Sequence, residues 1–338
     1  MTPIIIQLVT WNGEKYIPHL FKSLREQKFQ DFELWILDNG SIDATAQLTQ
    51  KELETIKQPH RFIQKEINIG FAPGHNELFR SSLDAAPYVV LLNQDMMLPS
   101  EFLEKLFYFV ESHPDAGAVS GRLMKWAFPE KTNLIDSLGL KSFKNHRFID
   151  MNGGEEWRSL EDDIKAVEVF GVSGALPLYR TNALRDVLYN EQIFDEDFFS
   201  YKEDVDLAWR LREAGWSAFS ILDAIAYHDR SASGPQGMSD KAAIDNRKYK
   251  SKLVKFYSYR NHILMLIKNY SFEGGVMGFF ATLWYELKKA IYLFIFTTRV
   301  FVKTWVDVLR LLPIMLRKRA FIQKNKHSAA DELDNWFK

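Results

Sequence analysis

The triplet Asn93-Gln94-Asp95 directly follows a short apolar run, residues 88–92, which has the length and composition of a buried strand. A carboxylate at the end of such a strand can hold a divalent cation, Mg²⁺ or Mn²⁺, against a diphosphate, because hard cations prefer oxygen ligands. The alternative is an ordinary polar turn after the strand. These residues alone leave both interpretations open.

Polar side chains also follow two earlier apolar runs. Thr10 and Asn12 follow the run that begins at Ile4, and Asp38 and Ser41 follow a second run. In an open α/β sheet the carboxyl ends of the parallel strands meet at one edge, where ligands bind. We therefore predict a nucleotide-sized crevice at this edge. No G-x-G-x-x-G follows the first strand and no P-loop motif occurs, so a bound nucleotide would depend on a metal held by a carboxylate.

Three acidic residues, Glu203, Asp204 and Asp206, open a helical pattern that runs toward Ala214. Acidic side chains in a first turn interact favourably with the helix dipole, so a capped helix explains them without any chemistry. The chemical alternative is that one of them is a general base. Asp206 is also spaced to pair with Arg210, four residues later.

The elements that would position these residues alternate along the N-terminal third. The expected strands are residues 4–9, 32–37, 61–64 and 88–92, and the expected helices are residues 16–27, 44–53 and 100–111, with a further helix after Asn76. This alternation predicts the α/β class, with a mostly parallel sheet and helices on both faces. Residues 125–163 are polar and predict an irregular, variable loop region.

Composition narrows the class of protein. The 338 residues suffice for one large or two ordinary domains. The formal net charge of -1 gives no argument for a nucleic-acid partner. The chain has no cysteine, which excludes disulfides and thiolate metal sites and fits a reducing compartment. Its first residues do not have the pattern of a signal peptide, so we expect a cytoplasmic protein.

Taken together, the sequence resembles the inverting glycosyltransferases of family 2, which have the GT-A fold, and within them the bacterial rhamnosyltransferase-like branch. The matching segments are residues 9–12, 37–43, 68–76, 92–95, 171–175, 194–199, 203–207 and Tyr227-His228. The resemblance implies a GT-A catalytic domain over residues 1–235. Its donor-binding half would be residues 1–120 and its acceptor-side half residues 121–235.

The resemblance also implies roles for single residues. An inverting transfer needs one general base for the acceptor hydroxyl, because a metal or cations stabilise the diphosphate leaving group. Asp204 matches that base, with Glu203 as a supporting neighbour, and Asp95 and His228 would ligate Mg²⁺ or Mn²⁺. Asn93 stands where the family has the first carboxylate of its metal motif. The residues implied in nucleotide or sugar binding are Thr10, Asn12, Asp38, Asn68, Gly70, Asn76, Asn93, Gln94 and Gly174.

Two of these residues have plain alternatives. A lone histidine such as His228 is often structural, and only a position in a pocket would make it functional. Gly174 lies in the stretch Gly171-Val172-Ser173-Gly174-Ala175, whose paired glycines could mark a packing turn between strands rather than a site that a ligand approaches.

The implied reaction moves a sugar to a hydroxyl of a membrane-linked glycan acceptor in bacterial cell-envelope polysaccharide biosynthesis. The best single guess for the donor is dTDP-L-rhamnose, and a UDP- or GDP-sugar is the first alternative. A sugar-phosphate nucleotidyltransferase would need a glycine-rich basic loop after the first strand, which residues 9–13 lack. A non-catalytic, membrane-associated scaffold with the same fold stays open, because Asn93 is a sign of lost chemistry.

From Lys252 the chain changes to long apolar blocks interrupted by basic residues. Residues 257–262 begin a helical pattern, and their Tyr-Arg-Asn core, Tyr259-Arg260-Asn261, also resembles the rhamnosyltransferase-like branch. No apolar block reaches the roughly 18 residues that a spanning helix needs. A helical wheel separates a polar arc from an apolar one. The polar arc holds Glu286, Lys288, Lys289, Arg299, Lys303, Asp307 and Arg310, and the apolar one holds Leu283, Leu287, Phe294, Phe301, Trp305 and Leu312.

We therefore predict an amphipathic helical region over residues 236–326, with a break or kink near Pro313, and a tail at residues 327–338. A basic, aromatic-rich amphipathic segment fits the anionic inner face of a cell membrane, where the protein would be peripherally associated. The alternative is that these helices pack on the catalytic domain or on a second subunit of a homo-oligomer.

Overall fold

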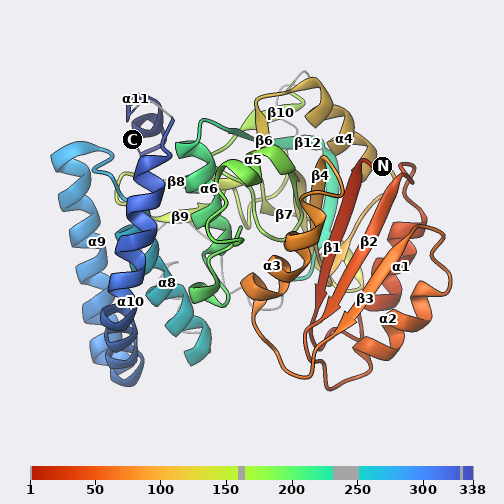
Figure 1. The fold of residues 1–338 in the computed structure, drawn as a ribbon, viewed down its shortest axis with the longest axis horizontal. Helices are drawn as coiled ribbons and strands as arrows, with labels where there is room; N and C mark the ends of the chain where they lie inside the picture. Colours follow the sequence, from red (N-terminus) through yellow and green to blue (C-terminus); the bar gives the residue numbers. More distant parts are fainter. Residues whose placement is uncertain (1, 159–163, 231–250, 328–329, 338) are drawn as a thin grey trace.

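The computed structural model describes residues 2–158, 164–230, 251–327 and 330–337 (Figure 1). Within them, ten strands form one sheet, in the order β10-β12-β6-β11-β4-β1-β2-β3, with β5 paired to β12 and β7 paired to β6. These strands are β1 (Ile4–Thr10), β2 (Phe32–Asp38), β3 (His60–Gln64), β4 (Tyr88–Asn93), β5 (Met96–Met97), β6 (Ala116–Ala127), β7 (Glu130–Ser137), β10 (Ala166–Glu168), β11 (Pro177–Arg180) and β12 (Ser217–His228). Two short strands, β8 (Leu140–Ser142) and β9 (Phe148–Asp150), pair separately.

Helices alternate with the N-terminal strands, and further helices follow β12. They are α1 (Ile17–Arg25), α2 (Thr45–Leu53), α3 (Phe71–Ser82), α4 (Phe102–Ser112), α5 (Thr181–Asp186), α6 (Glu203–Glu213), α8 (Lys252–Asn269), α9 (Gly275–Phe296), α10 (Thr298–Lys324) and α11 (Ala330–Asp334), with 3-10 turns η1 (Glu196–Phe198) and η2 (Asn335–Phe337). The four N-terminal strands predicted from the sequence are all present, within one or two residues of their expected ends.

The sheet has the predicted character. Strands β1 to β4 run parallel, β6 and β12 run parallel to each other, and β11 joins the two groups antiparallel to both. Side chains on β1 alternate between the two faces, so Ile4 and Ile6 pack with Phe21 of α1 while Ile5 packs with Leu78 of α3. A strand buried on both faces explains the unbroken apolar run at residues 4–6. The predicted α/β class, with a mostly parallel central sheet and flanking helices, is confirmed.

The prediction of an irregular loop over residues 125–163 is wrong for much of that range. Residues 130–137 form β7, an antiparallel partner of β6, and β8 and β9 follow. Ile135 and Leu138 are buried against Met124 and Leu222. The exposed side chains of β7 are polar, so the sequence of this strand resembles that of a loop. Residues 159–163 lie outside the described part of the chain.

The C-terminal helices lie at the far side of the molecule from β3 (Figure 1). The apolar blocks form two separate helices, α9 and α10, which end and begin on either side of Thr297, and α10 continues through Pro313. Helix α6 shares a hydrophobic core with α8 and α10, including Trp209, Leu264 and Met315. The region from α8 onward therefore packs against α6 and the segments around it. The boundary predicted at residue 235 lies outside the described residues.

The last residues form more structure than the predicted tail. Phe337 is buried and contacts the rings of Trp209, Phe148 and Phe170. Among the helices that the structure describes, none is both long enough and apolar enough to cross a bilayer.

Candidate active site

Four polar residues at the ends of β1 and β2 form one hydrogen-bonded group, which we call the strand-end network: Thr10, Asn12, Asp38 and Ser41. The buried Asp38 carboxylate accepts hydrogen bonds from the Thr10 hydroxyl at 2.9 Å and from the Ser41 hydroxyl at 2.6 Å. Asn12 has a left-handed backbone with φ of 46°, and its side-chain oxygen accepts from the Ile42 backbone N–H at 2.9 Å. The structure thus brings together the three nucleotide-binding residues predicted from these strands.

The loop before α3 lies beside this network. The Asn68 side-chain oxygen accepts from the Asn39 amide at 3.2 Å and from the Gly70 N–H at 2.8 Å. Gly70 has φ of 101°, and a Cβ there would lie 2.6 Å from the ring of Phe199, so this position requires glycine. Asn68 and Gly70 therefore connect the end of β2 to the segment that leads into α6.

Asp95 and His228 meet at the ends of two different strands. The pairing of β5 with β12 places His228 opposite Met96, and His228 Nε2 lies 3.4 Å from Asp95 Oδ1. His228 Nδ1 lies 2.9 Å from Oδ2 of the fully buried Asp136, on β7. Burial lowers the pKa of His228, but the carboxylates of Asp95 and Asp136 outweigh this effect and raise the pKa to about 9.

This geometry fits a divalent cation that displaces the proton of His228, since only a neutral imidazole ligates a metal. A carboxylate and an imidazole approach each other with a second carboxylate behind the imidazole, which is the arrangement that orients histidine ligands in metal sites. The described residues contain no cluster of three or more potential ligands. Mg²⁺ and Mn²⁺ sites for nucleotide substrates commonly use one or two protein ligands, with phosphate oxygens and water completing the shell.

The side chain of Gln94, which the resemblance implies in nucleotide or sugar binding, bonds to the backbone of Trp11 just after β1. Its oxygen accepts from the Trp11 N–H at 2.8 Å and its amide donates to the Trp11 carbonyl at 2.9 Å. A side chain at Gly13 would overlap this amide, so Gly13 leaves the space for it. Gln94 therefore ties the end of β4 to the end of β1, while Asn93 stays partly exposed at the last position of β4.

Asn76, which the resemblance also implies in nucleotide or sugar binding, lies in the protein interior. It is fully buried on α3, where its amide donates to the Phe194 carbonyl at 2.7 Å and its oxygen accepts from the N–H groups of Ile193 and Phe194. These bonds use its donor and acceptor atoms on the protein itself. Asn76 thus supports the segment before η1.

Glu203 and Asp204 open α6 in the predicted positions. Burial raises the pKa of the Asp204 carboxyl, which the nearby Lys202 and the N–H of Gly174 partly oppose. Burial also raises the pKa of Glu203, and the neighbouring Asp204 charge adds to that effect. Asp206 pairs with Arg210 at 3.0 Å, so the predicted pair four residues apart is confirmed.

Residues 174–175 connect Asp204 to the end of β4, which leads to Asp95. The Gly174 N–H donates to Asp204 Oδ2 at 3.2 Å, and the next residue, Ala175, accepts from the Asn93 N–H at 3.0 Å. A Cβ at Gly174 would lie 3.2 Å from that of Asp204, so a larger residue would crowd the carboxylate. Asp204 and the β4 end that leads to Asp95 therefore lie on either side of residues 174–175.

Three charged residues of the site were not predicted from the sequence: Asp136, Asp150 and Arg230. Arg230 lies 3.2 Å from the Asp136 carboxylate and also pairs with Asp150, and it donates to the Ser173 hydroxyl at 3.4 Å. The sequence signal for Asp136 is a carboxylate directly after the apolar residues Leu134 and Ile135. This signal is weak, because the surrounding residues 125–163 are mostly polar and predict a loop.

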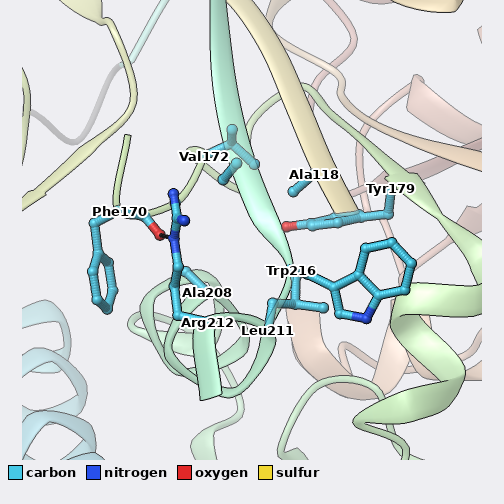
Figure 2. A pocket seen from close by; sticks show the side chains of 10 residues that line it. Ala118, Phe170, Val172, Tyr179, Ala208, Leu211, Arg212 and Trp216 are labelled. Atoms are coloured by element: carbon cyan, nitrogen blue, oxygen red, sulfur yellow. Dashed lines mark hydrogen bonds between the residues drawn. The ribbon is translucent and has the colours of Figure 1, made fainter. Parts of the chain in front are cut away.

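A small cavity lies behind α6, lined by Val172, Tyr179, Ala208 and Trp216 among others (Figure 2). Its volume of about 10 Å³ admits at most one water molecule. Its lining is largely apolar and it is too small for a sugar. It is a packing void rather than part of the site.

Comparison with known proteins gives a consistent result. The family model described as Glycosyl transferase family 2 matches residues 5–188, more than half of the chain. The N-acetylglucosaminyl-diphospho-decaprenol L-rhamnosyltransferase of Mycobacterium tuberculosis is 23% identical over 266 residues, which cover 74% of this chain and 84% of that protein.

Two relatives are matched only in part. The poly(ribitol-phosphate) beta-N-acetylglucosaminyltransferase TarS of Staphylococcus aureus is 27% identical over 200 residues, 53% of this chain and 34% of TarS. The teichoic acid poly(glycerol phosphate) polymerase of Staphylococcus epidermidis is 30% identical over 100 residues, 30% of this chain and 14% of the polymerase. The chain thus spans about a third or less of these two proteins.

Solved structures share the fold. S. aureus TarS 1-349 in complex with UDP-GlcNAc aligns with a TM-score of 0.54 at 17% identity, covering 99% of this chain and 90% of that one. GalNAc-T7 with UDP, GalNAc and Mn²⁺ aligns with a TM-score of 0.56 at 11% identity, covering 79% and 48%. At these identities the likeness concerns the fold alone.

Proposed function

The chain belongs to glycosyl transferase family 2, and from this premise we propose that it transfers a sugar from a nucleoside diphosphate to a hydroxyl, with inversion at the anomeric carbon. The observation that carries the proposal is the link through residues 174–175. It joins the partly buried carboxylate of Asp204 to the strand end that leads to Asp95. A base and a candidate diphosphate site thus adjoin one another.

In this reaction Asp204 takes the proton of the acceptor hydroxyl while that oxygen attacks the sugar. The Gly174 N–H fixes one carboxylate oxygen of Asp204, and burial raises the carboxyl pKa, which strengthens it as a base. Glu203 supports it from the neighbouring position. The strand-end network would bind the nucleoside, with Asp38 as the acceptor for a pyrimidine N–H.

Asp95 and His228 would hold a divalent cation, Mg²⁺ or Mn²⁺, with Asp136 orienting the histidine. Such a cation, when bound, neutralises charge on the diphosphate as it leaves. The structural neighbour GalNAc-T7 was solved with Mn²⁺ and UDP, which supports a metal-dependent site in this fold.

For the donor we favour dTDP-L-rhamnose, and for the acceptor a lipid-linked glycan of bacterial cell-envelope polysaccharide. The name of the M. tuberculosis relative, an N-acetylglucosaminyl-diphospho-decaprenol L-rhamnosyltransferase, supports L-rhamnose as the sugar and a lipid-linked acceptor. The TarS complex with UDP-GlcNAc favours the alternative of a UDP-sugar donor. A screen of donor turnover with dTDP-, UDP- and GDP-sugars, with and without Mn²⁺, separates these possibilities.

The catalytic roles have a direct test. Asp204→Asn should lower kcat at least about 100-fold, because a positioned general base contributes roughly 10²–10⁴-fold. Asp95→Ala should abolish the rise in thermal stability that Mn²⁺ gives in the presence of the donor nucleotide. Asp84→Asn removes a largely exposed carboxylate that pairs with Arg185, and serves as the control. Undiminished turnover in Asp204→Asn would refute the assigned role.

The outer faces of α9 and α10 support peripheral association with an anionic membrane. On α9 a stripe of large apolar side chains is exposed: Val276, Phe280, Leu283, Trp284, Leu287, Ile291 and Phe294. On α10 a second exposed stripe, Val302, Val306, Leu309 and Leu316, lies beside a row of exposed basic residues, Arg299, Lys303, Arg310, Arg317 and Lys324. An apolar surface flanked by basic side chains matches the interface of an anionic bilayer.

This assignment refines the predicted helical wheel. Within the apolar arc of the wheel, Leu283, Leu287 and Phe294 are exposed and so could contact lipid. Phe301 and Trp305 of the same arc pack partly against the core. Lys289 is buried and pairs with Glu286 at 2.7 Å, so it is not available to lipid headgroups. The exposed basic side chains that could meet lipid headgroups are therefore Lys288 on α9 and the basic row on α10.

Vesicle flotation tests the membrane surface. The full chain should float with phosphatidylglycerol vesicles and not with phosphatidylcholine vesicles, and Trp284→Ser with Leu287→Ser should abolish flotation. Ile42→Ser changes an exposed apolar residue at the strand-end side and should leave flotation unchanged. A chain that ignores both vesicles but forms concentration-dependent dimers, lost in the α9 variant, would assign the surface to a second copy instead.

A further inference from the structure

The segment that leads into Asp204 has an unusual backbone. Within residues 195–202, which we call the base loop, Phe199, Tyr201 and Lys202 have φ angles of 64°, 74° and 73°. Side chains with a Cβ avoid positive φ, because the Cβ crowds the neighbouring carbonyl. Three such residues among four persist only where surrounding contacts hold them.

Asn261 of α8 supplies contacts of this kind. It is fully buried, and its Nδ2 donates to the carbonyls of Phe198, Ser200 and Tyr201, at 2.9, 2.8 and 2.7 Å. The acceptors are the left-handed residue Tyr201 and the residues that directly precede the left-handed positions Phe199 and Tyr201. A single amide therefore holds the path of the backbone through the base loop.

The neighbouring residues on α8 hold the same loop. Arg260 donates to the carbonyls of Asp197 at 2.6 Å and Phe198 at 3.2 Å. Tyr257, one helical turn earlier, stacks on the ring of Phe199 with centroids 5.1 Å apart. Side chains three and four residues apart lie on one face of a helix, so a single face of α8 grips the base loop.

The base loop also contacts the loop beside the strand-end network. The Phe199 carbonyl accepts from the Ala72 N–H at 3.1 Å, and the ring of Phe199 fills the space that a side chain at Gly70 would occupy. The base loop thus lies between α8 on one side and the start of α3 on the other.

We propose that Asn261 and Arg260 are positioning residues for the transfer reaction: they fix the base loop so that Asp204 meets Gly174 at the candidate transfer site. The inference rests on the proposed function, since it concerns the carboxylate assigned there as the base. It also gives a role to Arg260 and Asn261 of the Tyr-Arg-Asn core of α8, which the proposed mechanism leaves unused.

The test compares Asn261→Ala with Leu264→Ala in the full chain. Leu264 is fully buried on α8, one turn beyond Asn261, and no hydrogen bond of its side chain reaches the base loop. Asn261→Ala should lower kcat at least roughly tenfold, with the donor KM within about twofold, because misplacing a catalytic group by about 1 Å costs up to about 100-fold. The acidic limb of its kcat profile should move to lower pH, as a loosened loop admits water to Asp204.

Leu264→Ala should lose stability while keeping the wild-type pH profile of kcat. Hydrogen exchange adds a measurement that does not need activity: amides of residues 196–204 should exchange faster in Asn261→Ala than in Leu264→Ala. Equal exchange in the two variants, or an equal fall in kcat with no change in pH profile, would overturn the inference. If the wild-type chain turns over no nucleotide sugar, the proposed function fails, and the exchange comparison still decides whether α8 fixes the loop.

Discussion

The strand-end network and the base loop are held in place by different kinds of contact. Thr10 and Asp38 are register partners on adjacent parallel strands, so the pairing of β1 with β2 itself brings them within hydrogen-bond distance. The base loop belongs to no sheet. Its carbonyls are held by Asn261, which lies 60 to 63 residues later in the chain.

The buried charges differ as well. Behind the base loop, Lys268 of α8 lies 2.7 Å from both Asp195 and Asp206, and Lys318 of α10 pairs with Asp195 and Asp197. The base side of the site is therefore assembled by helices that come after it in the chain. A change in those helices should disturb the base, whereas a change in the strand-end network should weaken nucleotide binding and leave the fold intact.

The largest effect is expected for Lys268→Met. Lys268 is buried, and its loss leaves Asp195 and Asp206 each with one cation fewer. Removing one partner of a buried ion pair typically costs about 3–5 kcal/mol, because a charge stays buried without full compensation. The free energy of unfolding, measured in urea, should fall by that amount.

Lys324→Met is the matched control for this prediction. Lys324 is an exposed lysine near the end of α10, and changes at such sites usually stay within about 0.5 kcal/mol. Similar losses for the two variants would show that the buried network does not distinguish the base side, and that part of the comparison would fail.

The second prediction concerns pH and Glu213, at the end of α6. Burial raises the pKa of this carboxyl to about 8, and the charges of Glu273 and Asp206 add to the effect against Lys326 and Arg210. Between pH 4.5 and 8 the folded chain keeps a proton that the unfolded chain releases. Glu213 therefore reduces stability progressively as pH rises through this interval.

Glu213→Gln should remove this dependence. Near pH 4.5 the variant should match the wild type, and at pH 9 it should be more stable by up to about 5 kcal/mol, since each unit of the pKa difference between 4.5 and about 8 corresponds to about 1.4 kcal/mol. Urea unfolding at the two pH values measures the difference. A gap that is constant, or largest at low pH, would contradict the assigned direction of the pKa shift.

This contrast also explains which parts of the site the sequence could predict. Short strands that end in polar residues have a local signal, so Thr10, Asn12 and Asp38 could be predicted to converge, and the parallel sheet does bring them together. The acidic start of α6 and its pair of Asp206 with Arg210 were equally local. Asp95 and His228 were joined only through the family resemblance, and the pairing of β5 with β12 gives the physical reason.

The rest depended on contacts between distant segments. Asn76 and Gln94 have the right residue types for ligand binding, but both use their amides on the backbone of another segment. Asp136 lies on a strand whose polar outer face resembles a loop, and its partner His228 is 92 residues away. Such pairings follow from tertiary packing, which no local pattern in a single sequence encodes.

The smallest expected effect tests the strand-end network, through Asp38→Asn. The asparagine keeps one oxygen for the hydroxyls of Thr10 and Ser41, but its amide faces the Ser41 N–H that Asp38 Oδ2 accepts at 3.0 Å. Losing one charged acceptor costs about 1–2 kcal/mol, so nucleotide affinity should fall roughly 5- to 30-fold. Calorimetric titration with dTDP and UDP measures this, and Glu33→Gln, near the opposite end of β2, is the control. Because the network is local, the kcat at saturating donor should change little; a large loss of kcat with unchanged affinity would mean that Asp38 acts on the reacting sugar and not on the nucleoside.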